Sequence, residues 1–293
     1  MTVVPSRVVV VTGANVGIGL ETAAGLAAVG ATTVLACRNP VKAESAAADV
    51  RARASSDDVH TVALDLADLA SVRACARELE ARFEHIDVLV NNAGGILQEQ
   101  GRTAQGFEKT FGVNYLGPFL LTNLLLERLV RSAEGSGDGR VVNVASVAHH
   151  WAKLDWDDLQ TTRRYRPFKA YGRSKLADIL FTRALAARLA GTAVTANALH
   201  PGNVRSGFGM DGDLRGYRGL GVKIYRPAEI SPAAGARTSI YLASSAEMAG
   251  KSGGYYVRCK PGHPSRRARS HEDAARLWRE SERLVADAGF PIP

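Results

Sequence analysis

The chain has no long apolar run and no secretory signal. No stretch of its 293 residues approaches the length that crosses a bilayer. The first apolar run already starts at Val8, which leaves no room for a signal peptide. These two absences predict a soluble, cytoplasmic protein that does not bind membranes.

Cysteine is scarce and shows no pattern. Cys37, Cys75 and Cys259 are odd in number and widely separated, so they cannot form a disulfide framework. Neither they nor the seven histidines have the spacing of metal ligands. We expect reduced, mostly structural thiols and no metal site.

The chain also lacks a strong charge cluster, although its net charge is +8. Basic residues are spread along the sequence, and the only tight group is Arg266, Arg267 and Arg269. Domains that bind nucleic acid gather such charge on one face, so we expect no nucleic-acid partner. A basic surface would still attract a phosphorylated small molecule.

Short β-branched runs alternate with amphipathic stretches along the whole chain. This alternation predicts an α/β fold, a single-domain doubly wound parallel sheet of about seven strands with helices on both faces. With 46% hydrophobic residues and no evident linker, we take residues 1–293 as one domain and the polar stretch Ser132 to Gly139 as a loop. The expected strands are Val8 to Thr12, Thr32 to Ala36, Val59 to Leu64, Val88 to Asn91, Val141 to Ala145, Val194 to Leu199 and Gly254 to Val257.

Two segments, residues 205–226 and 272–288, do not belong to this alternation of strands and helices. Residues 205–226 hold six glycines and little apolar periodicity, which favours a mobile flap over a substrate or, alternatively, a disordered surface insertion. Residues 272–288 form an amphipathic pattern that predicts a terminal helix. Its expected packing residues are Leu277, Trp278, Leu284 and Val285.

A glycine turn joins the first expected strand to the first expected helix, Leu20 to Val29. In this position a turn without side chains lets the backbone approach a pyrophosphate, and the helix directs its unpaired N–H groups toward it. The alternative is an ordinary tight turn. The turn residues expected to bind a dinucleotide are Gly13, Asn15, Val16, Gly17, Ile18 and Gly19.

Other motifs follow the ends of later strands. Asn92-Ala93-Gly94 follows the fourth strand, Ser146 the fifth, and Pro201-Gly202 the sixth. In a doubly wound sheet, ligands bind beyond the carboxyl ends of the strands, so these residues are expected to share one site with the glycine turn.

The end of the second strand predicts which dinucleotide is bound. An acidic residue at this place binds a ribose 2′-hydroxyl, whereas a basic residue accepts a 2′-phosphate. The strand ends at Cys37-Arg38-Asn39 without a carboxylate, and the Arg38 guanidinium suits a phosphate. We therefore expect NADP(H) rather than NAD(H), the alternative being a solvated charge at the strand end.

An acidic pair follows the third strand. Asp65, with its neighbour Leu66, is placed to contact the adenine ring of the cofactor. Asp68 in that role, or a helix cap, is the competing account of this pair.

Tyr171 and Lys175 stand four residues apart at the expected start of a long helix, which places both side chains on one face. A phenol has an ordinary pKa near 10, too high for acid–base work at neutral pH. An ammonium about 5 Å away, at an effective dielectric near 20, stabilises the phenolate by roughly 3 kcal/mol. The pair therefore predicts a tyrosine that exchanges protons, with Ser146 upstream of it.

The ordered combination of these motifs resembles the short-chain dehydrogenases/reductases, a superfamily of single-domain NAD(P)-dependent oxidoreductases. The resemblance implies a Rossmann-type fold and a catalytic tetrad of Asn114, Ser146, Tyr171 and Lys175. Residues 36–38, 113–122, 143–150 and 277–282 look most like the retinol-dehydrogenase-like branch.

The resemblance also implies a role for each residue. Tyr171 exchanges a proton with the carbonyl or alcohol oxygen, and Ser146 holds that oxygen. Lys175 also binds the nicotinamide ribose, and Asn114 supports a water beside Lys175. The segment expected to flank the nicotinamide contains Pro201, Gly202 and Val204.

The sequence departs from the common family pattern in two places. Ser206 stands where many members have threonine, which keeps a hydroxyl. Ser146 lies further before Tyr171 than in the commonest members, which matches the longer insertion of the retinol-dehydrogenase-like branch.

The insertion between Ser146 and Tyr171 is rich in rings: His149, His150, Trp151, Trp156, Tyr165 and Phe168. A cleft lined by them would favour a bulky apolar carbonyl or alcohol. Equally, these rings could only pack the insertion onto the sheet. Retinol itself is not carried over, because membrane-bound relatives have an anchoring segment that we do not find.

Three functions fit the pattern. The leading hypothesis is an NADPH-dependent carbonyl reductase or alcohol dehydrogenase acting on a small molecule. The second uses the same site for a non-redox cyclisation, dehydration or isomerisation. The third, a nucleotide sensor, has no need of the Tyr171-Lys175 pair. Association into a homo-oligomer is left open.

Overall fold

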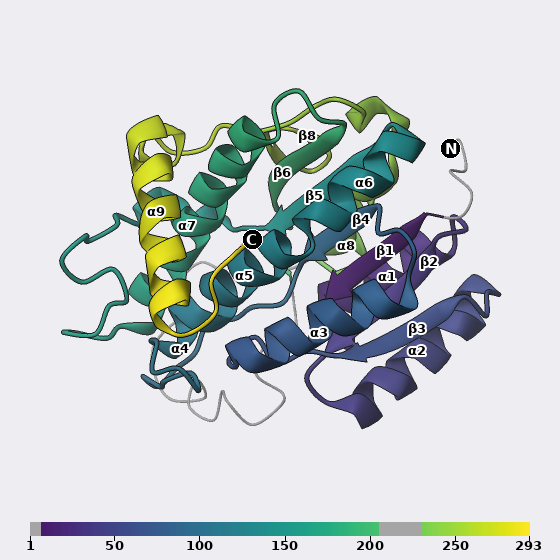
Figure 1. Cartoon of the computed structure of the whole chain (residues 1–293), viewed down its shortest axis with the longest axis horizontal. Helices are drawn as coiled ribbons and strands as arrows, with labels where there is room; N and C mark the ends of the chain where they lie inside the picture. Colours follow the sequence, from purple (N-terminus) through teal and green to yellow (C-terminus); the bar gives the residue numbers. More distant parts are fainter. Residues whose placement is uncertain (1–6, 205–229) are drawn as a thin grey trace.

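One mainly parallel sheet organises the chain (Figure 1). The computed structural model describes residues 7–204 and 230–293, where it has eight strands in the order β3-β2-β1-β4-β5-β6-β7-β8. All neighbouring pairs are parallel except β7 and β8. The strands are β1 (Val8–Thr12), β2 (Thr32–Cys37), β3 (Val59–Ala63), β4 (Val88–Asn91), β5 (Gly139–Val144), β6 (Val194–His200), β7 (Tyr255–Val257) and β8 (Lys260–Pro261).

Helices cover both faces of this sheet. Helices α1, α2 and α8 pack over one face with residues such as Val9 and Val11 of β1. Helices α3, α5, α6 and α7 cover the other face, where Val8 and Val10 point. The helices are α1 (Gly17–Ala27), α2 (Pro40–Ala54), α3 (Leu69–Arg82), α4 (Lys109–Phe111), α5 (Gly117–Leu124), α6 (Leu126–Ser136), α7 (Pro167–Arg188), α8 (Pro232–Ser244) and α9 (His271–Asp287).

The strands and helices form where local chemistry favours them. All five residues of β1 are buried, as expected of a parallel strand covered on both faces. Several helices begin at a side-chain cap: Asn39 for α2, Asp68 for α3, Ser231 for α8 and Ser270 for α9. The predicted α/β sheet with helices on both faces is therefore confirmed.

The terminal helix α9 lies beside α7 (Figure 1). Leu277, Trp278 and Val285 are buried there, and Leu284 packs at the edge of the same core. The Trp278 ring stacks on Phe181, with 5.7 Å between centroids. The amphipathic pattern over 272–288 thus predicted both the helix and its buried face.

The structure differs from the prediction in two places. Strand β8 was not expected, because it is only two residues long and joins the sheet antiparallel at its edge. The stretch Ser132 to Gly139 is mostly the end of α6 rather than a loop. Its serine hydroxyls bond to carbonyls one turn earlier, and Gly137 ends the helix at φ +75°.

The proposed flap at 205–226, including Ser206, lies outside the described residues. Within residues 7–204 and 230–293, no helix is long and apolar enough to cross a membrane.

Candidate active site

The order of the strands reverses between β1 and β4, and the predicted site residues gather there. Strands β2 and β3 lie on one side of β1, and β4 and β5 on the other. The chain leaves β1 toward α1 on one face of the sheet and leaves β4 toward α5 on the other. At such a switch point, beyond the carboxyl ends of the strands, doubly wound sheets bind their ligands.

The glycine turn is held against the end of β4. The side-chain amide of Asn92 donates to the Thr12 carbonyl at 2.8 Å, and the backbone amides of Asn92 and Ala93 donate to the Thr12 hydroxyl at 3.0 Å. A Cβ on Gly19 would stand 2.5 Å from the Asn92 amide nitrogen and 2.4 Å from the Gly13 carbonyl oxygen. Only glycine allows this approach, so the two predicted motifs form one surface.

This surface suits a dinucleotide pyrophosphate. Helix α1 has no side-chain cap at Val16 and no acidic residue in its first turn, so its first N–H groups remain available to an anion. Gly17 has a φ of +62°, and a Cβ built on it would meet nothing within 4 Å. The backbone therefore faces open space at the place where a phosphate would lie.

Arg38 occupies the predicted position at the carboxyl end of β2. It directly follows Cys37, the last residue of that strand, and is exposed. Its neighbour Asn39 caps α2 by accepting a hydrogen bond from the Lys42 amide. The strand end therefore presents a guanidinium and no carboxylate.

The acidic pair after β3 has divided roles. Asp68 caps α3 by accepting from the Ala70 amide at 2.9 Å. Asp65 accepts from the Ala67 amide at 2.9 Å and is only partly buried. Leu66 is buried and its backbone oxygen lies where a Cβ on Gly117 would clash. Helix capping thus accounts for Asp68, and Asp65 stays the candidate for adenine contact.

The segment after β6 approaches the glycine turn through α8. A Cβ on Gly235 would lie 2.5 Å from a Val204 methyl, 3.3 Å from Ile18 and 3.6 Å from the Pro201 carbonyl. Gly202 has a φ of +98°, which favours glycine. The structure therefore brings the segment that contains Pro201, Gly202 and Val204 beside Ile18.

Asn114 lies in a π-helical turn, Gly112–Leu116, between α4 and α5. Its side-chain oxygen accepts from the Gly95 amide, and its amide donates to the Gly95 carbonyl and to the Ser174 hydroxyl, all at 2.8 to 2.9 Å. Such turns are rare and recur at functional sites. Asn114 therefore fixes the loop after β4 to the helix that carries Tyr171.

Ser146 follows β5 and begins a 3₁₀ turn, Val147–Trp151. Its hydroxyl oxygen accepts from the Ala148 amide at 3.2 Å, so its own hydrogen can donate to a ligand. Its carbonyl accepts from His149 Nδ1 at 2.6 Å. The serine is thus held at both its side chain and its backbone.

Helix α7 approaches this turn closely. A Cβ on Gly172 would lie 3.2 Å from the Ala148 carbonyl oxygen, so a glycine beside Tyr171 permits the contact. Tyr171 is half-buried, and the Ser174 hydroxyl donates to its carbonyl at 2.8 Å. The structure therefore brings together the elements that carry Asn114, Ser146 and Tyr171.

Lys175 lies one turn after Tyr171 with its ammonium buried. Its Nζ is 5.8 Å from the centre of the Tyr171 ring and donates to the Val144 carbonyl at 2.8 Å and to Asp178 at 2.9 Å. Burial alone would lower the pKa of Lys175, but the charge of Asp178 and then the Tyr171 phenol outweigh it and raise that pKa. The lysine therefore carries its charge beside the tyrosine.

Comparison with known proteins identifies the family. The short chain dehydrogenase model matches residues 7–213. The chain belongs to the short-chain dehydrogenase family. It is 46% identical to human Retinol dehydrogenase 12 over 281 residues, which cover 96% of this chain and 87% of that protein. The chain is therefore an oxidoreductase of the retinol-dehydrogenase-like branch.

Solved short-chain dehydrogenase structures agree with this fold. An uncharacterised protein from Mycobacterium paratuberculosis superposes with a TM-score of 0.77 at 37% identity, covering 99% of this chain and 97% of that one. RhlG of Pseudomonas aeruginosa, solved as an NADP active-site complex, superposes with a TM-score of 0.66 at 27% identity. The match covers 87% of this chain and 95% of the RhlG chain.

In this short-chain dehydrogenase, the aromatic insertion divides into two groups. His149 is fully buried, Trp156 packs against the core beneath Arg276, and the Tyr165 hydroxyl bonds to the Leu97 carbonyl and to Thr110. The Trp151 and Phe168 side chains are instead 80% and 59% exposed. Packing thus explains the first group, and Trp151 and Phe168 lie on the surface of the insertion.

Four residues of this dehydrogenase site were not singled out by sequence: His149 as a support of Ser146, and Arg173, Ser174 and Asp178. The buried Arg173 guanidinium binds the insertion through the Lys153 and Asp158 carbonyls. A carboxylate one helical turn after Lys175, in a stretch rich in Leu, Ala, Ile and Phe, was the available signal for Asp178.

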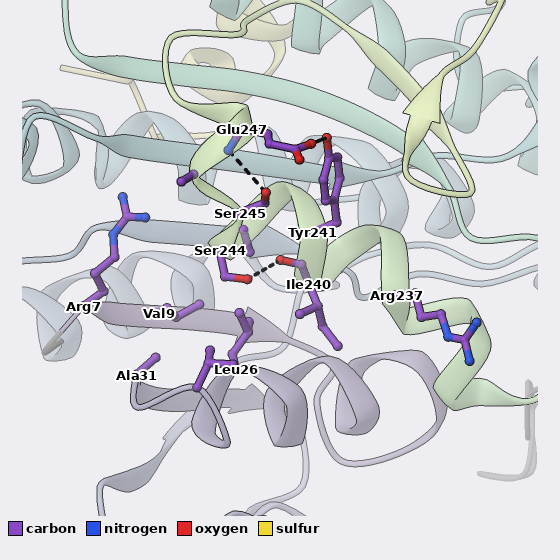
Figure 2. Close-up of a pocket in the computed structure, with 13 residues that line it drawn as sticks. Arg7, Val9, Leu26, Ala31, Arg237, Ile240, Tyr241, Ser244, Ser245 and Glu247 are labelled. Atoms are coloured by element: carbon purple, nitrogen blue, oxygen red, sulfur yellow. Dashed lines mark hydrogen bonds between the residues drawn. The ribbon is translucent and has the colours of Figure 1, made fainter. Parts of the chain in front are cut away.

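A separate cavity of about 560 Å³ lies at the amino end of β1, between α1 and α8 (Figure 2). Figure 2 shows Leu26 and Ile240 on its walls and Arg7 at its edge. No tetrad residue lines it, so it is distinct from the dehydrogenase site.

Proposed function

We propose that this short-chain dehydrogenase transfers a hydride between NADP(H) and the carbonyl or alcohol carbon of a bulky apolar small molecule. The observation that carries the proposal is the buried ammonium of Lys175, 5.8 Å from the Tyr171 ring. A lysine ammonium at that distance supports proton exchange by the Tyr171 hydroxyl with a bound substrate. The nicotinamide, when bound, would supply or accept the hydride.

Each residue of the proposed tetrad has a step that its contacts support. The Tyr171 hydroxyl donates its proton to the substrate oxygen in reduction and takes it back in oxidation. The Ser146 hydroxyl, whose oxygen already accepts from Ala148, donates to the same oxygen. Lys175 keeps its positive charge next to the phenol, and Asn114 holds the surrounding loops together.

The preference for NADP(H) rests on Arg38. The guanidinium at the end of β2 would meet a 2′-phosphate with two parallel hydrogen bonds. Arg38 and Asn39, the two residues that follow β2, include no carboxylate that could bind a 2′-hydroxyl. Gly13, Gly17 and Gly19 would hold the pyrophosphate, with Asp65 and Leu66 near the adenine.

The proposed substrate class follows from the exposed rings after Ser146. Trp151 and Phe168 offer apolar surface on the insertion that links Ser146 to Tyr171. The names of the curated relatives point the same way, since retinol is a long apolar alcohol. We therefore propose medium-length to long apolar aldehydes as substrates. Retinal, which the sequence alone gave no reason to expect, is included because of the names of these relatives.

Single-turnover absorbance tests the redox assignment. Enzyme in excess over NADPH is mixed with aldehydes of increasing length, and loss of the reduced-nicotinamide band is compared with alcohol formed. We expect one NADPH consumed for each alcohol. Product formed without loss of the band would contradict the proposal and favour the non-redox alternative, and binding without any product would favour a sensor.

A further inference from the structure

The Lys175 ammonium is a buried charge and needs a counter-charge. Its side chain is only 5% exposed. An ion in such a place is costly unless it is paired and hydrogen-bonded. Within the described residues its ion pair is with Asp178, whose oxygen is 2.9 Å away, and the Val144 carbonyl is its second partner.

Asp178 is equally enclosed. Its side chain is 8% exposed and lies one helical turn after Lys175 on α7. Its carbonyl accepts from the Thr182 hydroxyl at 2.7 Å, which in turn receives the side-chain amide of Asn143 on β5. Across residues 7–204 and 230–293, Lys175 is the only cation that forms an ion pair with Asp178.

The pair fixes the ammonium close to the loop after β4. A Cβ on Gly94 would lie 3.5 Å from Lys175 Nζ and 3.0 Å from the Asn114 side-chain oxygen. The backbone of the loop after β4 therefore covers the ammonium directly. From this position the same charge lies beside both the Tyr171 ring and the loop after β4.

We propose that Asp178 is a positioning residue of this site, whose buried carboxylate fixes the ammonium of Lys175 beside Tyr171 and supplies its counter-charge. The inference rests on the proposed function, because it gives Asp178 a role in setting the charge that acts on Tyr171. It adds a fifth side chain to the four that the family resemblance implies.

The titratable groups around the pair are few. Tyr171 faces it from α7, and the Tyr115 hydroxyl, bonded to Ser281 of α9 at 2.7 Å, faces it from the π-helical turn. Strand β5 contributes only the Val144 carbonyl to the ammonium. Burial raises the pKa of Asp178, and the neighbouring charge of Lys175 opposes that shift.

Asp178→Asn removes the charge and keeps the size. Without the carboxylate, burial acts on Lys175 with less opposition, so the ammonium loses its proton at lower pH. We expect the ¹³C NMR titration of the Lys175 ε-carbon, assigned with Lys175→Arg, to move to lower pH. We also expect the alkaline limb of kcat to move the same way and kcat to fall about tenfold.

Matched variants separate charge from structure. Asp138→Asn removes a carboxylate from the Arg140 ion pair before β5, at the amino end of the sheet, and should leave the Lys175 titration as in the wild type. Asp178→Glu keeps the charge and should titrate closer to the wild type than Asp178→Asn does. An unchanged Lys175 titration in folded Asp178→Asn would overturn the proposal.

The wild type gives a second measurement should Asp178→Asn not fold. With labelled aspartate and lysine, the Lys175 ε-carbon should report the ionisation of the Asp178 carboxyl, and independent titrations would overturn the pairing. The NMR readout needs no turnover. If the wild type does not oxidise NADPH, only the proposed function is contradicted. If the wild type is active but the titrations of Lys175 and Asp178 are independent, only the proposed role of Asp178 is contradicted.

Discussion

At the scale of single residues, burial decides the protonation states around the site. Lys175 is buried with a carboxylate and stays charged, whereas His149 is buried without one. Burial lowers the pKa of His149 to about 4, helped by His150 and opposed by the bond to the Ser146 carbonyl. Its Nδ1 hydrogen donates to that carbonyl, and Nε2 accepts from the Ser265 amide at 3.0 Å. A neutral histidine therefore joins Ser146 to the loop before α9.

The stability of the fold should depend on pH through His149. A histidine whose pKa is depressed in the folded state stabilises fully above its unfolded pKa, near 6.5, and that contribution is lost as pH falls toward 4. Between pH 7 and 4.5, we expect wild type to lose roughly 2 kcal/mol more of its free energy of unfolding than His149→Gln. Urea unfolding at the two pH values measures the difference.

The control for this experiment is the exposed His263. His263→Gln should keep the pH dependence of the wild type. If the stability of His149→Gln fell in acid as much as that of the wild type, the claim that a buried, neutral His149 causes the pH dependence would be wrong.

The proposed preference for NADP(H) rests on Arg38. Arg38→Asp replaces a phosphate partner with a carboxylate that suits a 2′-hydroxyl, so the ratio of kcat/KM for NADPH to that for NADH should fall roughly 10 to 100-fold. Lys251→Asp makes the same charge change before β7, at the amino end of the sheet, and should leave the ratio unchanged. A parent enzyme that uses both cofactors equally would already contradict the argument.

Single residues also show where the sequence stops being informative. The glycine turn, Ser146, Tyr171 and Lys175 could be predicted because their chemistry demands particular residues at particular spacings. The support given by His149 could not, because it depends on contact with Ser265, a residue more than a hundred positions away. The aromatic content of the insertion was visible, but which rings are buried depends on tertiary packing.

At the scale of helices and strands, α7 carries Tyr171 and Lys175 of the proposed tetrad, and the elements around it hold α7 in place. The π-helical turn contacts it through Asn114 and Ser174, and the 3₁₀ turn after β5 contacts it at Gly172. Helix α9 packs along its outer side through Trp278. The position of Tyr171 therefore depends on three elements distant in sequence.

Trp278 should be the main stabilising contact of α9. Its ring packs on Phe119 and Phe181, lies 3.8 Å from the Arg188 guanidinium carbon, and is 3% exposed. Trp278→Ala should lower the free energy of unfolding by about 3 to 5 kcal/mol, measured by chemical denaturation.

A substitution of an exposed residue on α9 is the control for Trp278→Ala. Arg283→Ala breaks two surface ion pairs and should cost about 1 kcal/mol or less. Equal losses in the two variants would show that α9 is not held by its aromatic face.

Periodicity predicted the long elements well and the short ones poorly. The buried strands and the amphipathic C-terminal helix have many residues that repeat one signal. Strand β8 has only two residues, too few to show a periodic pattern. The end of α6 is polar because its serine hydroxyls bond to the helix backbone instead of packing against the core.

At the scale of the whole molecule, the site results from the order of the strands. The sequence predicts parallel strands but not which ones are neighbours. Because β4 pairs with β1 on the side opposite β2, the loop after β4 meets the glycine turn, while Arg38 lies on the far side of that turn. The residues proposed to bind the pyrophosphate and the 2′-phosphate therefore lie at the carboxyl ends of neighbouring strands.

Transfer of label from NADPH tests the central claim most directly. NADPH carrying deuterium at both C4 positions of the nicotinamide is mixed with the best aldehyde substrate and either wild type or Tyr171→Phe, and the alcohol is analysed by mass spectrometry. The wild type should place one deuterium on the former carbonyl carbon. Tyr171→Phe should bind NADPH as before but transfer label at least about 100-fold more slowly. Unlabelled alcohol from the wild type, or transfer at the wild-type rate by the variant, would contradict the account.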